Sequence, residues 1–183
     1  MSGPSRRVEV VTWYLEMTAP EELVPHGSGA GRLDLVEVTD PDPDFAWFLY
    51  AAVGRRWGWV DRLGWTREEW REHGAREDVS LQVARLGGGP VGYVELRLQL
   101  PRSVQIEYLG LLPAFLGRGL GGELLTRAVR TAWRWRPERV WLHTCSLDAP
   151  AALENYRARG FRVYDETREE KELPLEPPVR WPE

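Results

Sequence analysis

The chain has 183 residues, of which 43% are hydrophobic and 28% are charged, a balance typical of a globular protein with one domain. Its formal net charge of −4 disfavours nucleic acid as a partner, and no apolar run approaches the roughly 20 residues that span a bilayer. The single cysteine excludes an internal disulfide, and three scattered histidines lack zinc-ligand spacing, so we expect no metal site. The N-terminal region has no long apolar stretch of the signal-peptide kind, which predicts a cytoplasmic protein without a membrane partner.

The first half of the chain predicts strands at its start and helices after them. Alternating side chains indicate the strands, prolines and glycines indicate the linker, and polar residues with capping propensity indicate the helix starts. The capping box of Thr66 and Glu69 is the clearest of these starts. In chain order, we expect a strand over 6–15, a linker over 18–32, a strand over 33–38 and helices over 45–53 and 66–72.

The second half predicts strands that alternate with helices. A glycine-rich turn over 87–90 joins two strands, Asp148 is expected to cap a helix, and Gly160 is expected to end that helix. In chain order, we expect strands over 79–86, 91–100 and 103–112, a helix over 120–135, a strand over 139–144, a helix over 149–159, and strands over 161–167 and 170–175. This order predicts an α+β fold of three layers (α/β/α), with helices on both faces of a twisted mixed sheet.

The chain divides into three parts by composition. Residues 33–176 form the expected domain, residues 1–32 an extra strand with its linker, and residues 177–183 a tail that begins with two prolines. The extra strand is also a means by which two copies could pair, so a homodimer is possible.

The segment 106–123 carries the chemistry. A strand ends at Pro113, and glycines then open a helix. Backbone N–H groups at a helix N-terminus have no intrahelical partner and bind phosphate, and glycine lets the backbone approach an anion closely. Arg118 adds a positive charge.

Three ligands were compared for this segment. A P-loop needs Gly-Lys-Ser/Thr, which is missing. The run 117–122 matches the dinucleotide pattern G-x-G-x-x-G, but residues 113–116 separate it from the strand, and Glu138 precedes the next strand where an acidic residue should end it. These departures disfavour a nicotinamide-dependent oxidoreductase. The longer connector favours the pyrophosphate of coenzyme A.

The run 111–121 resembles the cofactor motif of the GNAT family of acetyl-CoA-dependent acyltransferases. The family has Gln or Arg where this chain has Leu116. A second motif of the family, Ala-x-x-x-Tyr-x-x-x-Gly-Phe, is matched by Ala152, Tyr156, Gly160 and Phe161. Where the family often has Asn three residues before that alanine, this chain has Ala149. The resemblance covers about residues 33–175 and implies the GNAT fold, with acetyl-CoA as the cosubstrate.

The resemblance also implies roles for particular residues. Tyr156 would donate a proton to the departing thiolate, and the backbone near Leu109 and Leu111 would hold the acyl carbonyl and the pantetheine arm. The implied cofactor-binding residues are Leu109, Leu111, Leu116, Gly117, Arg118, Gly119, Leu120, Gly121, Gly122 and Asn155. A core position for Tyr156 and a solvent-facing Asn155 are the alternatives.

An ammonium ion cannot attack a thioester, so the reaction needs a base. Strand alternation places Gln105, Glu107, Leu109 and Leu111 on one face, and Glu107 is the carboxylate among them. Glu107 is therefore the predicted base, with an ordinary solvated strand residue as the alternative. The resemblance implies direct transfer in a ternary complex.

The acceptor is predicted to be a small primary amine with an aromatic or cationic body. Tyr50, Trp57 and Trp59 are the expected acceptor-binding residues, because aromatic faces attract cations, although the same residues could simply pack two helices on the sheet. Two other functions were weighed. Cys145 could be a nucleophile activated by His143, and the chain could be a non-catalytic acyl-CoA-binding or sensory module on the same fold.

Overall fold

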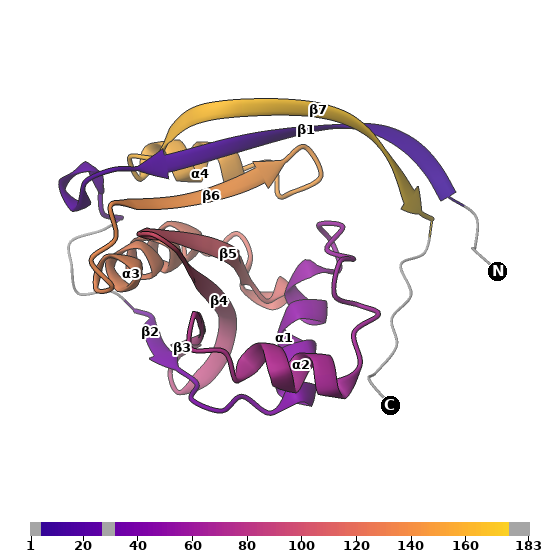
Figure 1. Cartoon of the computed structure of the whole chain (residues 1–183), viewed down its shortest axis with the longest axis horizontal. Helices are drawn as coiled ribbons and strands as arrows, with labels where there is room; N and C mark the ends of the chain where they lie inside the picture. The colour runs from indigo at the N-terminus through magenta and orange to yellow at the C-terminus, as the bar shows by residue number, and fades with distance from the viewer. Residues whose placement is uncertain (1–4, 27–31, 176–183) are drawn as a thin grey trace.

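The computed structural model describes residues 5–26 and 32–175 and contains a seven-stranded sheet in the order β2-β3-β4-β5-β6-β1-β7 (Figure 1). Neighbouring strands are antiparallel except β5 and β6, which are parallel, so the sheet is mixed as predicted. The strands are β1 (Ser5–Met17), β2 (Asp34–Glu37), β3 (Val79–Leu86), β4 (Gly89–Gln99), β5 (Ser103–Leu111), β6 (Arg139–Cys145) and β7 (Arg162–Pro174). The helices are α1 (Pro43–Gly54), α2 (Arg67–Gly74), α3 (Gly121–Trp133) and α4 (Ala152–Ala158), with short 3₁₀ helices over Pro20–Glu22 and Pro113–Phe115.

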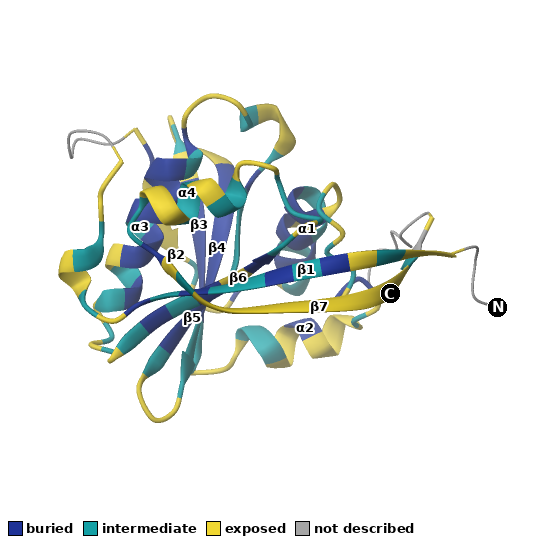
Figure 2. Cartoon of the chain, turned by 90° about the horizontal axis from the view of Figure 1, so that it is seen from above, coloured by how far each residue is buried: buried dark blue, intermediate teal, exposed yellow. Residues whose placement is uncertain are grey.

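Two apolar clusters hold the three layers together. One joins α3 to the sheet and includes Leu124 and Leu125, both fully buried, with α4 packed against it. The other joins α1 and α2 to the opposite face and includes Trp47 and Trp70 (Figure 2). Burying a leucine contributes about 1.5–3 kcal/mol, so each helix is held mainly by its apolar stripe. The predicted α+β fold with three layers is confirmed.

Local signals in the sequence set several of the observed boundaries. The Asp42 carboxylate accepts hydrogen bonds from the backbone of Asp44 and Phe45 at the start of α1, and the predicted capping box of Thr66 and Glu69 begins α2. Gly160 has φ +99° just after α4, a conformation that favours glycine, as its predicted role at the helix end requires.

Two predictions about the last third of the chain are wrong. Asp148 does not cap α4, which begins at Ala152; its Oδ2 instead accepts from Thr144 Oγ1 (2.6 Å) and Cys145 N (3.0 Å) and closes the turn after β6. The two strands expected over 161–167 and 170–175 form one continuous strand, β7, because it pairs with β1 along nearly its whole length.

The N-terminal strand lies inside the sheet. β1 pairs with β6 on one side and with β7 on the other, and β1 and β7 extend together as a long ribbon (Figure 1). The division of the chain at residue 33 stays a prediction, and the tail over 177–183 lies outside the described residues. Among the residues described, no helix is long and apolar enough to cross a membrane.

Candidate active site

The parallel strands β5 and β6 separate in the middle of the sheet. They pair only where Ser103–Gln105 meets Arg139–Trp141, although β5 continues to Leu111 and β6 to Cys145. A cavity of about 880 Å³ opens at the separation, within the usual size range of small-ligand sites. Most of the predicted site residues line it: Glu107, Leu109, Leu111, Leu116, Gly117, Gly119, Leu120, Gly121, Gly122, Asn155, Tyr156, Trp57 and Trp59.

One end of the cavity is the N-terminus of α3. Gly117 and Gly119 both have φ +73° in the loop before it, so the loop needs glycine at these positions. A Cβ at Gly122 would lie 2.7 Å from Arg159 Nη1 and 2.8 Å from His26 Nδ1, which places both side chains beside this helix end. The cations, the free N–H groups and the helix dipole together make this end favourable for a polyanion.

Arg118 occupies a different place from its glycine neighbours. Its side chain lies over the Phe115 ring, with Cζ 5.1 Å from the ring centre, and it is not among the cavity-lining residues. Its backbone carbonyl accepts a hydrogen bond from Arg32 Nη2 (3.1 Å). These contacts hold the glycine loop in its curved shape and add positive charge near the opening.

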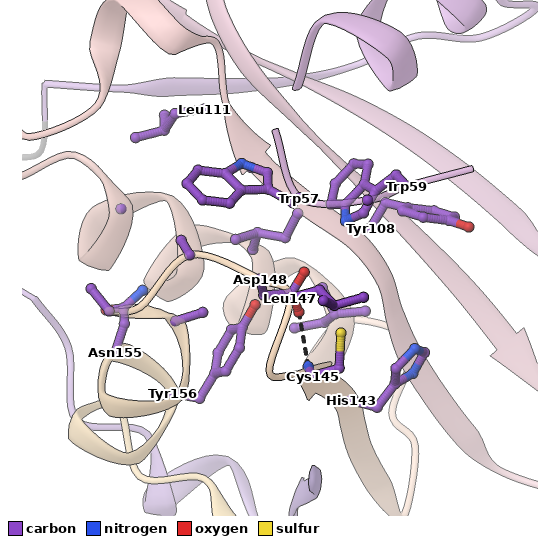
Figure 3. A pocket seen from close by; sticks show the side chains of 18 of the residues that line it. Trp57, Trp59, Tyr108, Leu111, His143, Cys145, Leu147, Asp148, Asn155 and Tyr156 are labelled. Atoms are coloured by element: carbon purple, nitrogen blue, oxygen red, sulfur yellow. Dashed lines mark hydrogen bonds between the residues drawn. The ribbon is translucent and has the colours of Figure 1, made fainter. Parts of the chain in front are cut away.

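Helix α4 directs two of the predicted residues into the cavity. Figure 3 shows Asn155 and Tyr156 on one side of the space and Trp57, Trp59 and Tyr108 on the other. The Asn155 amide lies close to the start of α3, where its Nδ2 would be 3.8 Å from a Cβ at Gly121. Burial raises the pKa of Tyr156 well above the usual value for tyrosine, so its phenol is a neutral proton donor near neutral pH.

Strand β5 contains a bulge that changes which side chains share a face. Glu95 is opposite Tyr108 and Leu96 is opposite Ile106, so Glu107 is the extra residue. Leu109 and Leu111 therefore pack with α3, whereas Glu107 contacts two arginines on the α1–α2 side. The prediction that Glu107 shares one face with these leucines is wrong, although all three line the cavity.

Glu107 belongs to a largely buried charge network. Arg62 Nη1 donates to both carboxylate oxygens of Glu95 (2.8 and 2.9 Å), and Arg62 Nη2 lies 3.3 Å from Glu107 Oε1. His73 Nε2 is 2.8 Å from Glu95, and Arg97 Nη1 is 3.6 Å from Glu107. The network fixes the loop between α1 and α2 to the centre of the sheet.

The network acts on the two carboxyl groups in opposite directions. Burial, reinforced by the Glu95 charge, raises the pKa of Glu107 despite the opposing effects of Arg62 and Arg97. Burial also disfavours the charged form of Glu95, but the His73 hydrogen bond and the Arg62 charge outweigh it and lower the pKa of Glu95. Glu107 Oε2 is buried without a hydrogen-bond partner, so it is free to accept a proton.

The three aromatic residues predicted for the acceptor separate into different environments. Trp57 lines the cavity from the loop after α1. Trp59 lines it too, but its ring packs against Tyr108 at a centroid distance of 4.8 Å and against Tyr50 at 5.7 Å. Tyr50 is 1% exposed, accepts a hydrogen bond from the backbone of Arg62 and does not line the cavity. Tyr50 is thus a core residue beneath the site.

Strands β1, β6 and β7 form the wall opposite this loop, here called the strand platform. Its cavity-lining residues recur at every second position, as one face of a sheet requires: Val10, Thr12, Tyr14, His143, Cys145, Glu169, Lys171 and Leu173. Burial raises the pKa of the Cys145 thiol, and within the described residues no hydrogen bond joins it to His143. A nucleophilic cysteine would need the opposite shift.

Sequence comparisons agree with this architecture. The sequence model for "Acetyltransferase (GNAT) family" matches residues 40–161. The chain belongs to the GNAT family. The predicted family and enzyme class, the GNAT-type N-acetyltransferases, are thereby confirmed.

Individual relatives are more distant. An uncharacterized N-acetyltransferase of Mycobacterium tuberculosis is 32% identical over 84 residues, which are 46% of this chain and 53% of that protein; the match thus spans about half the length of each. A GCN5-related N-acetyltransferase of Sphaerobacter thermophilus superposes with a TM-score of 0.63 at 20% identity, covering 94% of this chain and 54% of that one. A second from Kribbella flavida gives 0.58 at 16%, covering 92% and 60%. The structural matches establish the GNAT fold.

Several residues that line or support this GNAT cavity were not predicted from the sequence: Thr12, Tyr14, His26, Asp61, Arg62, Tyr108, Asp148, Arg159 and Lys171. Alternation within 8–14 and within 169–173 indicates which side chains share a face of each strand. It does not indicate that the two strands are neighbours. Asp61 and Arg62 lie in a loop without a recognisable motif, so no sequence signal marks them.

Proposed function

We propose that the protein transfers an acetyl group from acetyl-CoA to a small primary amine, by direct attack in a ternary complex. One observation carries the proposal. A single cavity, opened by the separation of β5 and β6, joins the cationic N-terminus of α3 to an aromatic end where Glu107 exposes an unpaired oxygen. Such charge separation suits a polyanionic cosubstrate at one end and a cationic acceptor at the other.

The cosubstrate would lie along the line of predicted residues. Its pyrophosphate would meet the backbone from Leu116 to Gly122, with Arg159 and His26 beside it. Its pantetheine arm would follow the edge of β5 beyond Gln105, where β6 no longer pairs and backbone groups are free to hydrogen-bond. The thioester would then lie between β5 and Tyr156.

Each chemical step has a residue of suitable character. Glu107 would take a proton from the acceptor ammonium, directly or through a water, because its raised pKa favours proton acceptance. The neutral amine would attack the thioester carbonyl, and backbone N–H groups near Leu109 and Leu111 would stabilise the oxyanion. Collapse of the tetrahedral intermediate would break the C–S bond, and Tyr156 would protonate the thiolate.

A direct test is the release of free thiol from acetyl-CoA in the presence of a panel of primary amines, with the acetylated product identified by mass spectrometry. Amine-dependent release at more than the spontaneous rate would support transfer. If acetyl-CoA binds by calorimetry but no amine is acetylated, the non-catalytic acyl-CoA-binding module would be the better description.

Replacing Gly119 with Asp tests the pyrophosphate site. Two unit charges about 4 Å apart interact by about 4 kcal/mol at an effective dielectric constant of about 20, and solvent screening reduces this value. We therefore expect acetyl-CoA affinity to fall by about tenfold to a hundredfold in calorimetry. Gly119→Ala is the matched control, since it imposes the same strain at φ +73° without the charge and should lose less affinity. Equal losses in both variants would show that loop shape, and not anion binding, was disturbed.

Trp57 and Trp59 give a paired test of the acceptor end. We expect Trp57→Ala to raise the acceptor KM about fivefold with little change in melting temperature, because loss of a cation–π contact costs about 1 kcal/mol. Trp59→Ala should lower the melting temperature as well, because its ring packs against Tyr108 and Tyr50. Acetyl-CoA affinity should be unchanged in Trp57→Ala. An unchanged acceptor KM in that variant would remove Trp57 from the acceptor site.

A further inference from the structure

The charged groups at the acceptor end of the cavity are nearly all compensated within the protein. Glu107 has Arg62 and Arg97, and Lys171 Nζ lies 2.8 Å from Glu169 Oε1 on the strand platform. The Lys171–Glu169 pair therefore presents little net charge to a ligand. Asp148 is also satisfied, because its Oδ2 accepts two hydrogen bonds at the turn after β6.

Asp61 is the exception. It lines the cavity and is exposed, and within residues 5–26 and 32–175 its side chain forms no ion pair and no hydrogen bond. The neighbouring residue Arg62 fixes its position, because Arg62 is 4% exposed and bound to Glu95. A rigid, unpaired carboxylate in a ligand cavity is a site for a cation that the protein does not itself supply.

Electrostatic neighbours place Asp61 between the two walls. Burial is the main reason that the pKa of Tyr108 on β5 is raised, and the charges of Asp61 and Glu107 add to it. The pKa of Lys171 on the platform is raised first by its hydrogen bond with Glu169, and the Asp61 charge also contributes. Asp61 thus lies within electrostatic reach of both walls, and the Tyr108 phenol is close to both carboxylates.

We propose that the acceptor carries a second cationic group besides the amine that reacts, and that Asp61 binds this second group. The inference rests on the proposed acetyltransferase function, in which Glu107 receives the reacting amine. Between the two carboxylates the cavity offers the aromatic faces of Tyr108 and Trp57, against which an aliphatic or aromatic body would pack (Figure 3). Asp61 is then a specificity-determining residue of the acceptor end.

Cadaverine and pentylamine test the inference, because they share a five-carbon chain and differ in the second ammonium group. We expect the wild-type protein to have a higher kcat/KM for cadaverine than for pentylamine. Asp61→Asn should lower the ratio of these two values about fivefold, the scale of one partly exposed ion pair. Asp34→Asn is the control, since Asp34 is exposed on β2 and does not line the cavity.

Ionic strength gives a second readout that a merely structural role would not change. The cadaverine preference of the wild type should weaken as salt is raised, and that of Asp61→Asn should respond less. A ratio unchanged by Asp61→Asn, or phenethylamine preferred to cadaverine equally in both proteins, would overturn the inference while leaving acetyl transfer intact. If no amine is acetylated, the proposed function fails, and calorimetry decides the inference separately: cadaverine binding no tighter than pentylamine binding, or none detected, would overturn it.

Discussion

Replacing Tyr156 with phenylalanine is expected to lower kcat by about 10²–10⁴-fold while leaving acetyl-CoA affinity nearly unchanged. The variant removes only the hydroxyl, which acts when the thiolate departs, and keeps the ring that contacts Phe161 at a centroid distance of 6.3 Å. Burial raises the pKa of Tyr156, so the wild-type phenol should stay protonated across the neutral range. The loss should therefore be nearly the same at each pH between about 6 and 9.

Tyr164→Phe is the matched control for this variant. Tyr164 lies on β7, is 42% exposed and does not line the cavity, so removal of its hydroxyl should leave kcat at the wild-type value. Melting temperatures of the two variants will show whether either has lost stability. A Tyr156→Phe protein that is folded, binds acetyl-CoA and turns over at the wild-type rate would exclude Tyr156 as the acid and leave solvent to protonate the thiolate.

The cofactor end could be predicted because its signals are local. Glycines that follow a strand and open a helix determine an anion site by themselves, and Gly117 and Gly119 have the positive φ angles that explain their identity. Tyr156 is placed by its helix, whose start differs from the prediction only because Asp148 closes the preceding turn. Such features depend on residues close together in sequence, so one chain suffices to find them.

The acceptor end could not be predicted because it depends on distant pairing. The strand platform exists because β1 lies between β6 and β7, and no pattern within residues 5–17 specifies those neighbours. The bulge at Glu107 is similarly silent, since strict alternation in the sequence places this residue on the wrong face. Arg62 was missed for the same reason, because an arginine in a loop gives no sign of a buried partner such as Glu95.

Replacing Glu107 with glutamine is expected to lower kcat/KM near neutral pH by about 10²–10⁴-fold, because the variant keeps the shape of the side chain but cannot accept a proton. The deficit should shrink as pH rises toward the pKa of the acceptor amine, where the amine needs no base. In the wild type, a base must be deprotonated to act, so kcat/KM should fall as pH decreases through the pKa of Glu107. Burial raises that pKa, so this limb should lie above the usual range for glutamate.

Arg97→Gln tests whether the acidic limb belongs to Glu107. Arg97 Nη1 lies 3.6 Å from Glu107 Oε1 and favours the charged carboxylate, so its removal should raise the pKa of Glu107 and move the limb to higher pH. The plateau rate above the limb should remain close to wild type, since Arg62 still holds the carboxylate in place. A limb that stays at its wild-type pH in Arg97→Gln belongs to another group. A Glu107→Gln protein with the wild-type pH profile would make Glu107 only the ion-pair partner of Arg62, and bulk water the base.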